Sequence, residues 1–171
     1  MKPNLLQRVD VKLRQALPVL LILICILLSV APLRLPDHAL VTPGLVLVAV
    51  FYWTVHRPDL LRPWNACLLG LLDDILSGTG MGVNALVLTL VHWVVVSQHR
   101  VFLGRSFAVV WIAFALVAPL AIAAIAVMSA LAARGTVDPA VVVVQSLLTI
   151  AAYPPLAWLF GRAQRLFLAA V

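Results

Sequence analysis

The chain has 171 residues, of which 64% are hydrophobic and only 11% are charged, and its mean hydropathy of +1.13 lies outside the range of ordinary soluble domains. This composition predicts an integral membrane protein. The net charge of +6 raises the question of a nucleic-acid partner. The basic residues, however, flank apolar runs of membrane-spanning length, which is typical of topology signals. We therefore expect no nucleic-acid binding.

Residues 1–15 form a basic leader before the first apolar run. Leu5, Val9 and Leu13 are four residues apart and share one helical face, while the basic side chains fall on another. Two interpretations stay open: a helix lying in the membrane interface, and a leader that only sets topology. The first apolar run ends in SVAPLRLP without a small-x-small cleavage pattern, so we expect a retained first helix.

Apolar segments recur six times along the chain. A spanning helix needs about 20 mostly apolar residues, and fewer where neighbouring helices cover it. The predicted spans are residues 17–33, 39–55, 64–77, 83–98, 106–133 and 138–160. We therefore predict an all-α integral membrane protein. Residues 1–171 form a single transmembrane domain, in which residues 16–165 make a six-helix bundle.

Lysines and arginines are distributed unevenly between the two ends of these spans. If the N-terminus is cytoplasmic, only Arg34 and Arg134 of the twelve basic residues fall outside, which leaves ten inside. Such asymmetry follows the positive-inside rule. Trp53, Trp64 and Trp158 lie near the predicted inner boundaries, where amphipathic rings suit the headgroup region. We predict that both termini are cytoplasmic.

The third predicted span is short and carries two acidic residues, Asp73 and Asp74. From Trp64 to Ser77 it has about 14 residues, or about 21 Å of helix, against a hydrocarbon core of about 30 Å. The segment SGTGMG follows, and its three glycines disfavour helix. We expect this turn to lie below the outer membrane surface, where protein or water must cover its backbone polar groups.

Asp74 is predicted near the middle of the membrane, where an aspartate costs about 2.5–3.5 kcal/mol on an insertion scale. Gly70, Asp74 and Gly78 are four residues apart and lie along one helical stripe, so a second helix can approach the carboxylate closely. Asp73 lies about 100° round the helix and faces a different direction. We expect this segment to insert with span 83–98 as a hairpin, with the aspartates turned toward protein or a wet cavity.

Several roles for the acidic pair stay open. His92 is the one basic side chain well inside a neighbouring span, and we predict that it contacts Asp74 or Asp73. The aspartates either cap backbone groups of the nearby loop or bind a partner or ligand directly. A proton relay would need more ionisable groups than one acidic pair and one histidine. Asn84, just past the glycines, is predicted to cap the next helix or to bond the loop backbone.

Prolines and cysteines complete the pattern. Pro119 in the fifth span, and Pro154 and Pro155 in the sixth, predict kinks because each removes an amide donor. Cys25 and Cys67 lie in separate segments without CxxC spacing. The sequence contains no catalytic Ser/His/Asp or Cys/His pattern and no phosphate loop. We therefore expect no enzymatic activity, no metal and no cofactor.

The stretch GLLDDILSGTGMGVNAL resembles the rod shape-determining protein MreD family of bacterial inner-membrane proteins. The pattern G-x-x-x-D-x-x-S-G-x-x-x-G carries the resemblance, and it is met here by Gly70, Asp74, Ser77, Gly78 and Gly82. The aromatic FYW before a basic turn and the closing YPPLAWLFGRAQRLF support it. The resemblance places the family's acidic position on Asp74 and leaves Asp73 as an extra carboxylate.

The resemblance implies a nonenzymatic, multi-pass subunit of the cell-elongation machinery that modulates peptidoglycan synthesis and cell shape. Its implied partner is the single-span protein MreC, and through the complex MreB, RodA and a class B penicillin-binding protein. In this interpretation the glycine stripe around Asp74 forms or braces a docking surface within the bilayer. Stoichiometry, homo-oligomers included, stays open.

The family is also similar in architecture to the six-helix substrate-binding subunits of energy-coupling-factor transporters. That similarity supplies an alternative function, the binding of a small vitamin-like molecule for transport. Asp73, Asp74 and Asn84 would then line an outward pocket under the glycine loop.

Overall fold

The computed structural model describes residues 18–29, 43–98 and 106–168. The regular structure in these ranges is all helical, as predicted. The helices are Pro18–Ser29, α2 (Leu45–His56), α3 (Pro63–Ser77), α4 (Val83–Ser97), α6 (Phe107–Ala133) and α7 (Pro139–Leu168). The predicted leader at residues 1–15 lies outside the described ranges.

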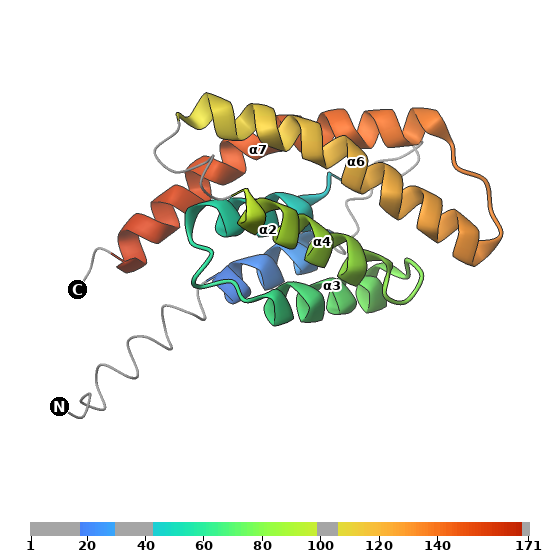
Figure 1. Cartoon of the computed structure of the whole chain (residues 1–171), viewed down its shortest axis with the longest axis horizontal. Coiled ribbons are helices and arrows are strands. Elements are labelled where there is room, and N and C mark those ends of the chain that lie inside the picture. Colours follow the sequence, from blue (N-terminus) through green and yellow to red (C-terminus); the bar gives the residue numbers. More distant parts are fainter. Residues whose placement is uncertain (1–17, 30–42, 99–105, 169–171) are drawn as a thin grey trace.

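The helices form two layers (Figure 1). The long helices α6 and α7 make one layer, and the shorter helices make the other. Two antiparallel hairpins dominate the packing: α3 with α4, joined by residues 78–82, and α6 with α7, joined by residues 134–138. Helix α2 connects the layers because it contacts both α4 and α7.

Only some of these helices match the thickness of a bilayer. Helices α6 and α7 have 27 residues or more and apolar windows of mean hydropathy 2.6 and 1.7, so by length and composition both can cross a membrane. Helix α2 has 12 residues, and α3 and α4 have 15 each. At 1.5 Å per residue these reach only about 18–23 Å, against about 30 Å of hydrocarbon. Six spans therefore remain a prediction.

The predicted boundaries agree closely with the helices α3, α4 and α6. The sixth predicted span ended at residue 160, but α7 continues to Leu168. That boundary was wrong because hydropathy reports where lipid ends, whereas Arg162 and Arg165 are good helix formers and continue the helix beyond the apolar segment. Pro154 and Pro155 lie inside α7, which changes direction along its length in Figure 1.

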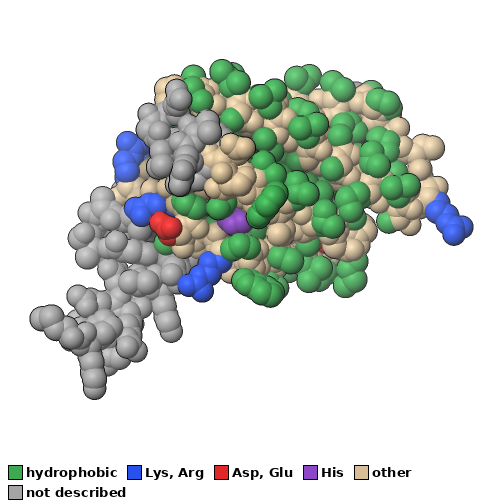
Figure 2. Space-filling model, viewed as in Figure 1, with side chains coloured by type: hydrophobic (Ala, Val, Ile, Leu, Met, Phe, Trp, Pro, Cys, Tyr) green, Lys and Arg blue, Asp and Glu red, His purple; other side chains and the backbone are tan. Residues whose placement is uncertain are grey.

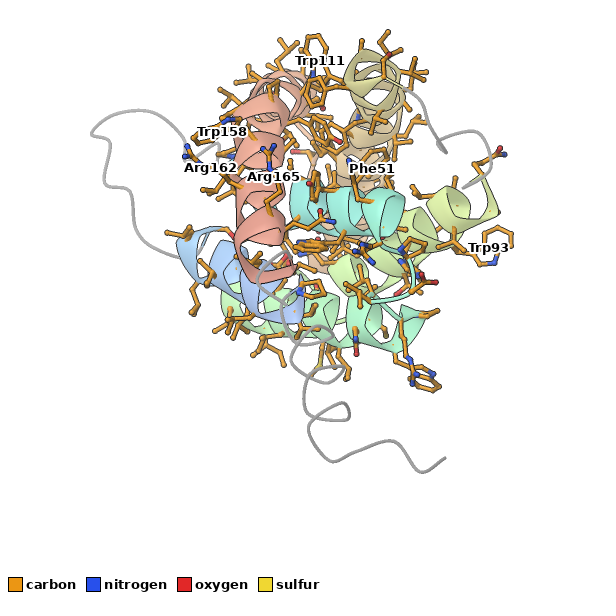
Figure 3. The ribbon with its side chains drawn as sticks, turned by 90° about the vertical axis from the view of Figure 1, so that its left-hand side faces the viewer. Phe51, Trp93, Trp111, Trp158, Arg162 and Arg165 are labelled. Carbon is orange, nitrogen blue, oxygen red and sulfur yellow. The ribbon has the colours of Figure 1, made fainter. Side chains whose placement is uncertain are left out.

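Helix α2 forms the centre of the core. Residues 46–55 are all buried, as expected for a helix that is hydrophobic all round. The ring of Phe51 meets that of Phe114 on α6 edge to face, with centroids 5.0 Å apart, and Phe114 stacks on Tyr153 of α7 at 4.6 Å. Aromatic pairs with these geometries are stabilising beyond the area they bury. This aromatic cluster joins α2 to the layer of α6 and α7. The position of Phe51 is labelled in Figure 3.

The described arginines are segregated along the molecule. Arg57 follows α2, Arg62 precedes α3, and Arg162 and Arg165 lie in the last turns of α7. These positions fall at one end of the bundle, and Arg134 lies at the opposite end, where α6 stops (Figure 1). Hydrophobic side chains cover the face between the two ends (Figure 2). This is the charge distribution that the predicted topology requires.

Candidate functional site

The α3–α4 hairpin is defined by local signals at both of its turns. Helix α3 begins with Pro63 at its first position, where no backbone bond is lost, and Gly78 follows its last residue, Ser77. Gly78 has a φ of +69° and Gly82, which begins α4, has a φ of +93°. Residues with a Cβ rarely adopt such values. The two glycines therefore permit a connection of only five residues, 78–82.

Gly70 is the point where α3 and α4 come into backbone contact. A Cβ added there would lie 2.5 Å from the Cα of Ala85 and 2.8 Å from its nitrogen. The predicted close approach of a second helix is therefore confirmed at Gly70. It is not confirmed at Gly78, where an added Cβ would meet nothing within 4 Å. Gly78 serves the turn rather than the helix contact.

The carboxylate of Asp74 accepts four hydrogen bonds, although its side chain is only 2% exposed. Its Oδ1 accepts from the Thr79 hydroxyl at 3.2 Å and from the Asn84 amide at 2.9 Å. Its Oδ2 accepts from the Gly82 amide at 3.0 Å and from the Ala85 amide at 3.1 Å. Three of these donors are backbone N–H groups at the start of α4. The carboxylate thus lies in a cradle of amides.

This cradle accounts for the unpaired amides at the start of α4. The first four N–H groups of a helix have no partner within it. Gly82, in the N-cap position, has no side chain with which to cap them. Asp74 accepts three of the four, and Val83 donates to the Gly80 carbonyl at 3.2 Å. Asp74 therefore caps α4 from another helix.

The same geometry explains how a charged group is tolerated in the interior. The N-terminus of a helix carries a partial positive charge, and the backbone amides there donate hydrogen bonds to both carboxylate oxygens. Within the described residues, Asp74 forms no salt bridge with a lysine or arginine. The helix end and the amides supply the compensation. Of the two roles left open for Asp74, these bonds show the capping one.

Thr79 and Asn84 close the network around the loop. The Asn84 side chain donates to the Thr79 hydroxyl at 3.0 Å, and that hydroxyl in turn donates to Asp74. The prediction that Asn84 caps α4 is wrong, because Asn84 lies inside the helix and bonds a loop side chain. Sequence reasoning missed Thr79. Its position among the glycines, five residues after Asp74, was the available signal, since Thr hydroxyls bond locally in turns.

Asp73 has a different environment, as its position on the helix predicted. It is 8% exposed, and the Ser77 hydroxyl, one turn further along α3, donates to its Oδ1 at 3.3 Å. This bond stays within one helix. The hydrogen bond between Asp73 and Ser77 therefore does not join α3 to α4.

His92 does not contact the aspartates, so that prediction is wrong. Its Nδ1 lies 2.9 Å from the hydroxyl oxygen of Thr54 on α2. Asp74 reaches the first turn of α4 at Asn84 and Ala85, which precede His92 by about seven residues, or about 10 Å of helix. The glycine loop is so short that α4 begins beside Asp74. His92 consequently lies about two turns further along α4, away from the aspartates.

The loop comes close to α6 at Gly80. A Cβ added at Gly80 would lie 3.2 Å from the Cβ of Ala132 in the last turn of α6. This contact is local to Gly80, because nothing lies within 4 Å of an added Cβ at Gly78 or Gly82 and Met81 is 83% exposed. At membrane depth, irregular backbone needs protein or water around its polar groups.

The family model of the rod shape-determining protein MreD matches residues 10–162. The match covers most of the chain and includes the whole cradle. The chain belongs to the MreD family. Members of this family are bacterial membrane proteins with a rod shape-determining role in the MreBCD complex. No solved structure matches the chain.

The cradle joins α3 to the start of α4 within the chain. All four donors around Asp74 come from the chain itself, which leaves its carboxylate engaged rather than poised for chemistry. Within the described ranges, no group of three or more His, Cys, Asp or Glu side chains could hold a metal ion. The arrangement fixes the relative position of two helices.

Proposed function

We propose that this MreD-family chain is a nonenzymatic membrane subunit of the bacterial cell-elongation complex. It crosses the inner membrane with six helices and both termini in the cytoplasm, binds MreC within the bilayer, and thereby modulates peptidoglycan synthesis and cell shape. The family match over residues 10–162 is the observation that carries the proposal. The segregation of Arg57, Arg62, Arg162 and Arg165 from Arg134 supports the orientation.

In this proposal the α3–α4 hairpin is a preformed surface. Asp74 and the contact at Gly70 hold the two helices in one relative position. A rigid surface loses less conformational freedom when a partner binds, so more of the contact energy remains as affinity. Asp74 and its cradle of amides hold the docking surface in place, and they do not themselves touch MreC. MreB, RodA and the class B penicillin-binding protein are reached through the complex.

The geometry does not favour the transport alternative. That function needs polar groups of Asp73, Asp74 and Asn84 free to meet a ligand. Asp74 and Asn84 instead bond Thr79 and the amides of α4. The structure has an apolar groove beside α3 and α4, but none of these three residues lines it.

Copurification tests the proposed function. The full-length chain and tagged MreC are expressed together and extracted in mild detergent, and the amount of chain recovered with MreC is measured. We expect recovery with the wild type, and at least a tenfold lower recovery with Asp74→Asn, because in either orientation the amide nitrogen would face at least one backbone N–H donor of α4. Asp59→Asn, the same change at an exposed site, is the control and should match the wild type. Failure of the wild type to recover MreC would contradict the proposal.

A further inference from the structure

An apolar groove runs along the outer face of α4 beside the first turns of α3. Its volume is about 610 Å³, and its floor includes the small side chains of Cys67, Ala85 and Thr89. It extends along α4 from Gly82 to Val96, which is about 21 Å of helix. Its length and its lining at intervals of three to four residues correspond to one face of a helix packed alongside another.

Large side chains flank this floor and are exposed. Leu86 is 51% exposed, Leu90 55% and Trp93 70%. Figure 3 shows Trp93 projecting away from the helices. Small residues on the floor let another backbone approach closely, and the larger ones provide contact on its sides. The groove therefore has the form of a seat for a helix.

His92 gives this groove a specific polar requirement. Thr54 donates its only hydroxyl hydrogen to the Val50 carbonyl at 2.7 Å. The 2.9 Å contact between Thr54 Oγ1 and His92 Nδ1 consequently has Nδ1–H as the donor. In the neutral imidazole, Nε2 then carries a lone pair and is an acceptor. His92 lines the groove, and among the described residues nothing donates to Nε2.

We propose that this groove seats a single transmembrane helix of a partner protein, and that a side-chain donor on that helix bonds Nε2 of His92. Serine, threonine, asparagine or glutamine at the matching depth has the required chemistry. A lipid acyl chain fills apolar space equally well but has no donor, and it would leave the acceptor unpaired in hydrocarbon. The inference rests on the proposed function and names the place where MreC binds.

Photocrosslinking in intact membranes tests the seat. Leu90 → p-benzoylphenylalanine places the reactive group in the groove, and the same replacement of Leu120, 73% exposed on α6, is the matched control. With tagged MreC present, we expect a crosslink from position 90 that maps to the transmembrane segment of MreC, and none from position 120. Crosslinks from position 90 to lipid alone, or to a second copy of the chain, would overturn the inference.

Two substitutions of His92 test the hydrogen bond. Asparagine places a polar atom where Nδ1 was, so His92→Asn keeps the bond to Thr54 and removes the acceptor in the groove. Glutamine reaches the position of Nε2, so His92→Gln keeps that acceptor. We expect His92→Asn to lower MreC recovery about three- to fifteen-fold, the range for interhelical hydrogen bonds in membranes, and His92→Gln to keep it. Equal recovery with His92→Asn and the wild type would overturn the role of His92.

The outcomes separate this inference from the proposed function. If MreC copurifies with the wild type but never crosslinks from position 90, the proposed function stands and the groove is not the seat. If MreC does not copurify with the wild type, the proposed function itself fails.

Discussion

The two hairpins of this molecule are held together by different means. In α3–α4, one carboxylate bonds three amides of the facing helix, and the backbones touch at Gly70. In α6–α7, the contacts include the stack of Phe114 on Tyr153 and a hydrogen bond from the Trp111 indole to the Ile150 carbonyl at 3.2 Å.

The difference has a physical origin in the solvent. Lipid is as apolar as leucine, so burying apolar side chains between helices gains little in a bilayer, and packing and hydrogen bonds decide the association. Helices α6 and α7 are long and apolar enough to cross a membrane. Short helices with a glycine loop need internal partners for every polar group. We therefore expect single substitutions to damage α3–α4 far more than α6–α7.

The largest effect is expected at Asp74. Asp74→Asn leaves at least one buried backbone N–H facing another N–H group and weakens the remaining bonds, so the free energy of unfolding should fall by about 2–5 kcal/mol. Asp73→Asn affects only the bond from Ser77 and should cost less than about 1 kcal/mol. Denaturant titrations in mixed micelles measure both values. Equal costs for the two neighbouring aspartates would contradict the assignment of the cap to Asp74.

A smaller effect is expected at Gly70. The added methyl group of Gly70→Ala would collide with the backbone of α4 and push the helices apart, at a cost of about 1–3 kcal/mol. Gly135→Ala in the α6–α7 connection is the control, because nothing lies within 4 Å of its added Cβ. The same titration measures both. A Gly70→Ala protein as stable as Gly135→Ala would mean that the helices are not in backbone contact.

The smallest effect is expected in the long hairpin. Trp111→Phe removes one hydrogen bond to α7 and should lower the free energy of unfolding by about 0.5–1 kcal/mol. Trp64→Phe, at a site that is 78% exposed, is the control and should cost nothing measurable. If Trp111→Phe cost as much as Asp74→Asn, the contrast between the two hairpins would disappear.

The sequence predicted the parts of this site that depend on local signals. Pro63 and Gly78 mark the ends of α3, and the spacing of Gly70 and Asp74 predicted a close approach of helices on the side of the carboxylate. Local pattern could not choose between capping and binding for Asp74, because that depends on where α4 begins in space.

Contacts between helices that are distant in the sequence could not be predicted from it. The pairing of His92 with Thr54 depends on how α4 crosses α2, which no periodicity within either helix specifies. For the same reason, the sequence wrongly predicted that His92 lies at the same depth in the membrane as Asp74. The hydroxyl of Thr79 returns to Asp74 only because the loop folds back over the end of α3.

Amide hydrogen exchange at the start of α4 tests the central claim most directly. If Asp74 caps this helix, the amides of Gly82, Asn84 and Ala85 should exchange slowly in the wild type and much faster in Asp74→Asn, while amides in the middle of α6 keep their rates. Unchanged exchange at these three amides in Asp74→Asn would contradict the account.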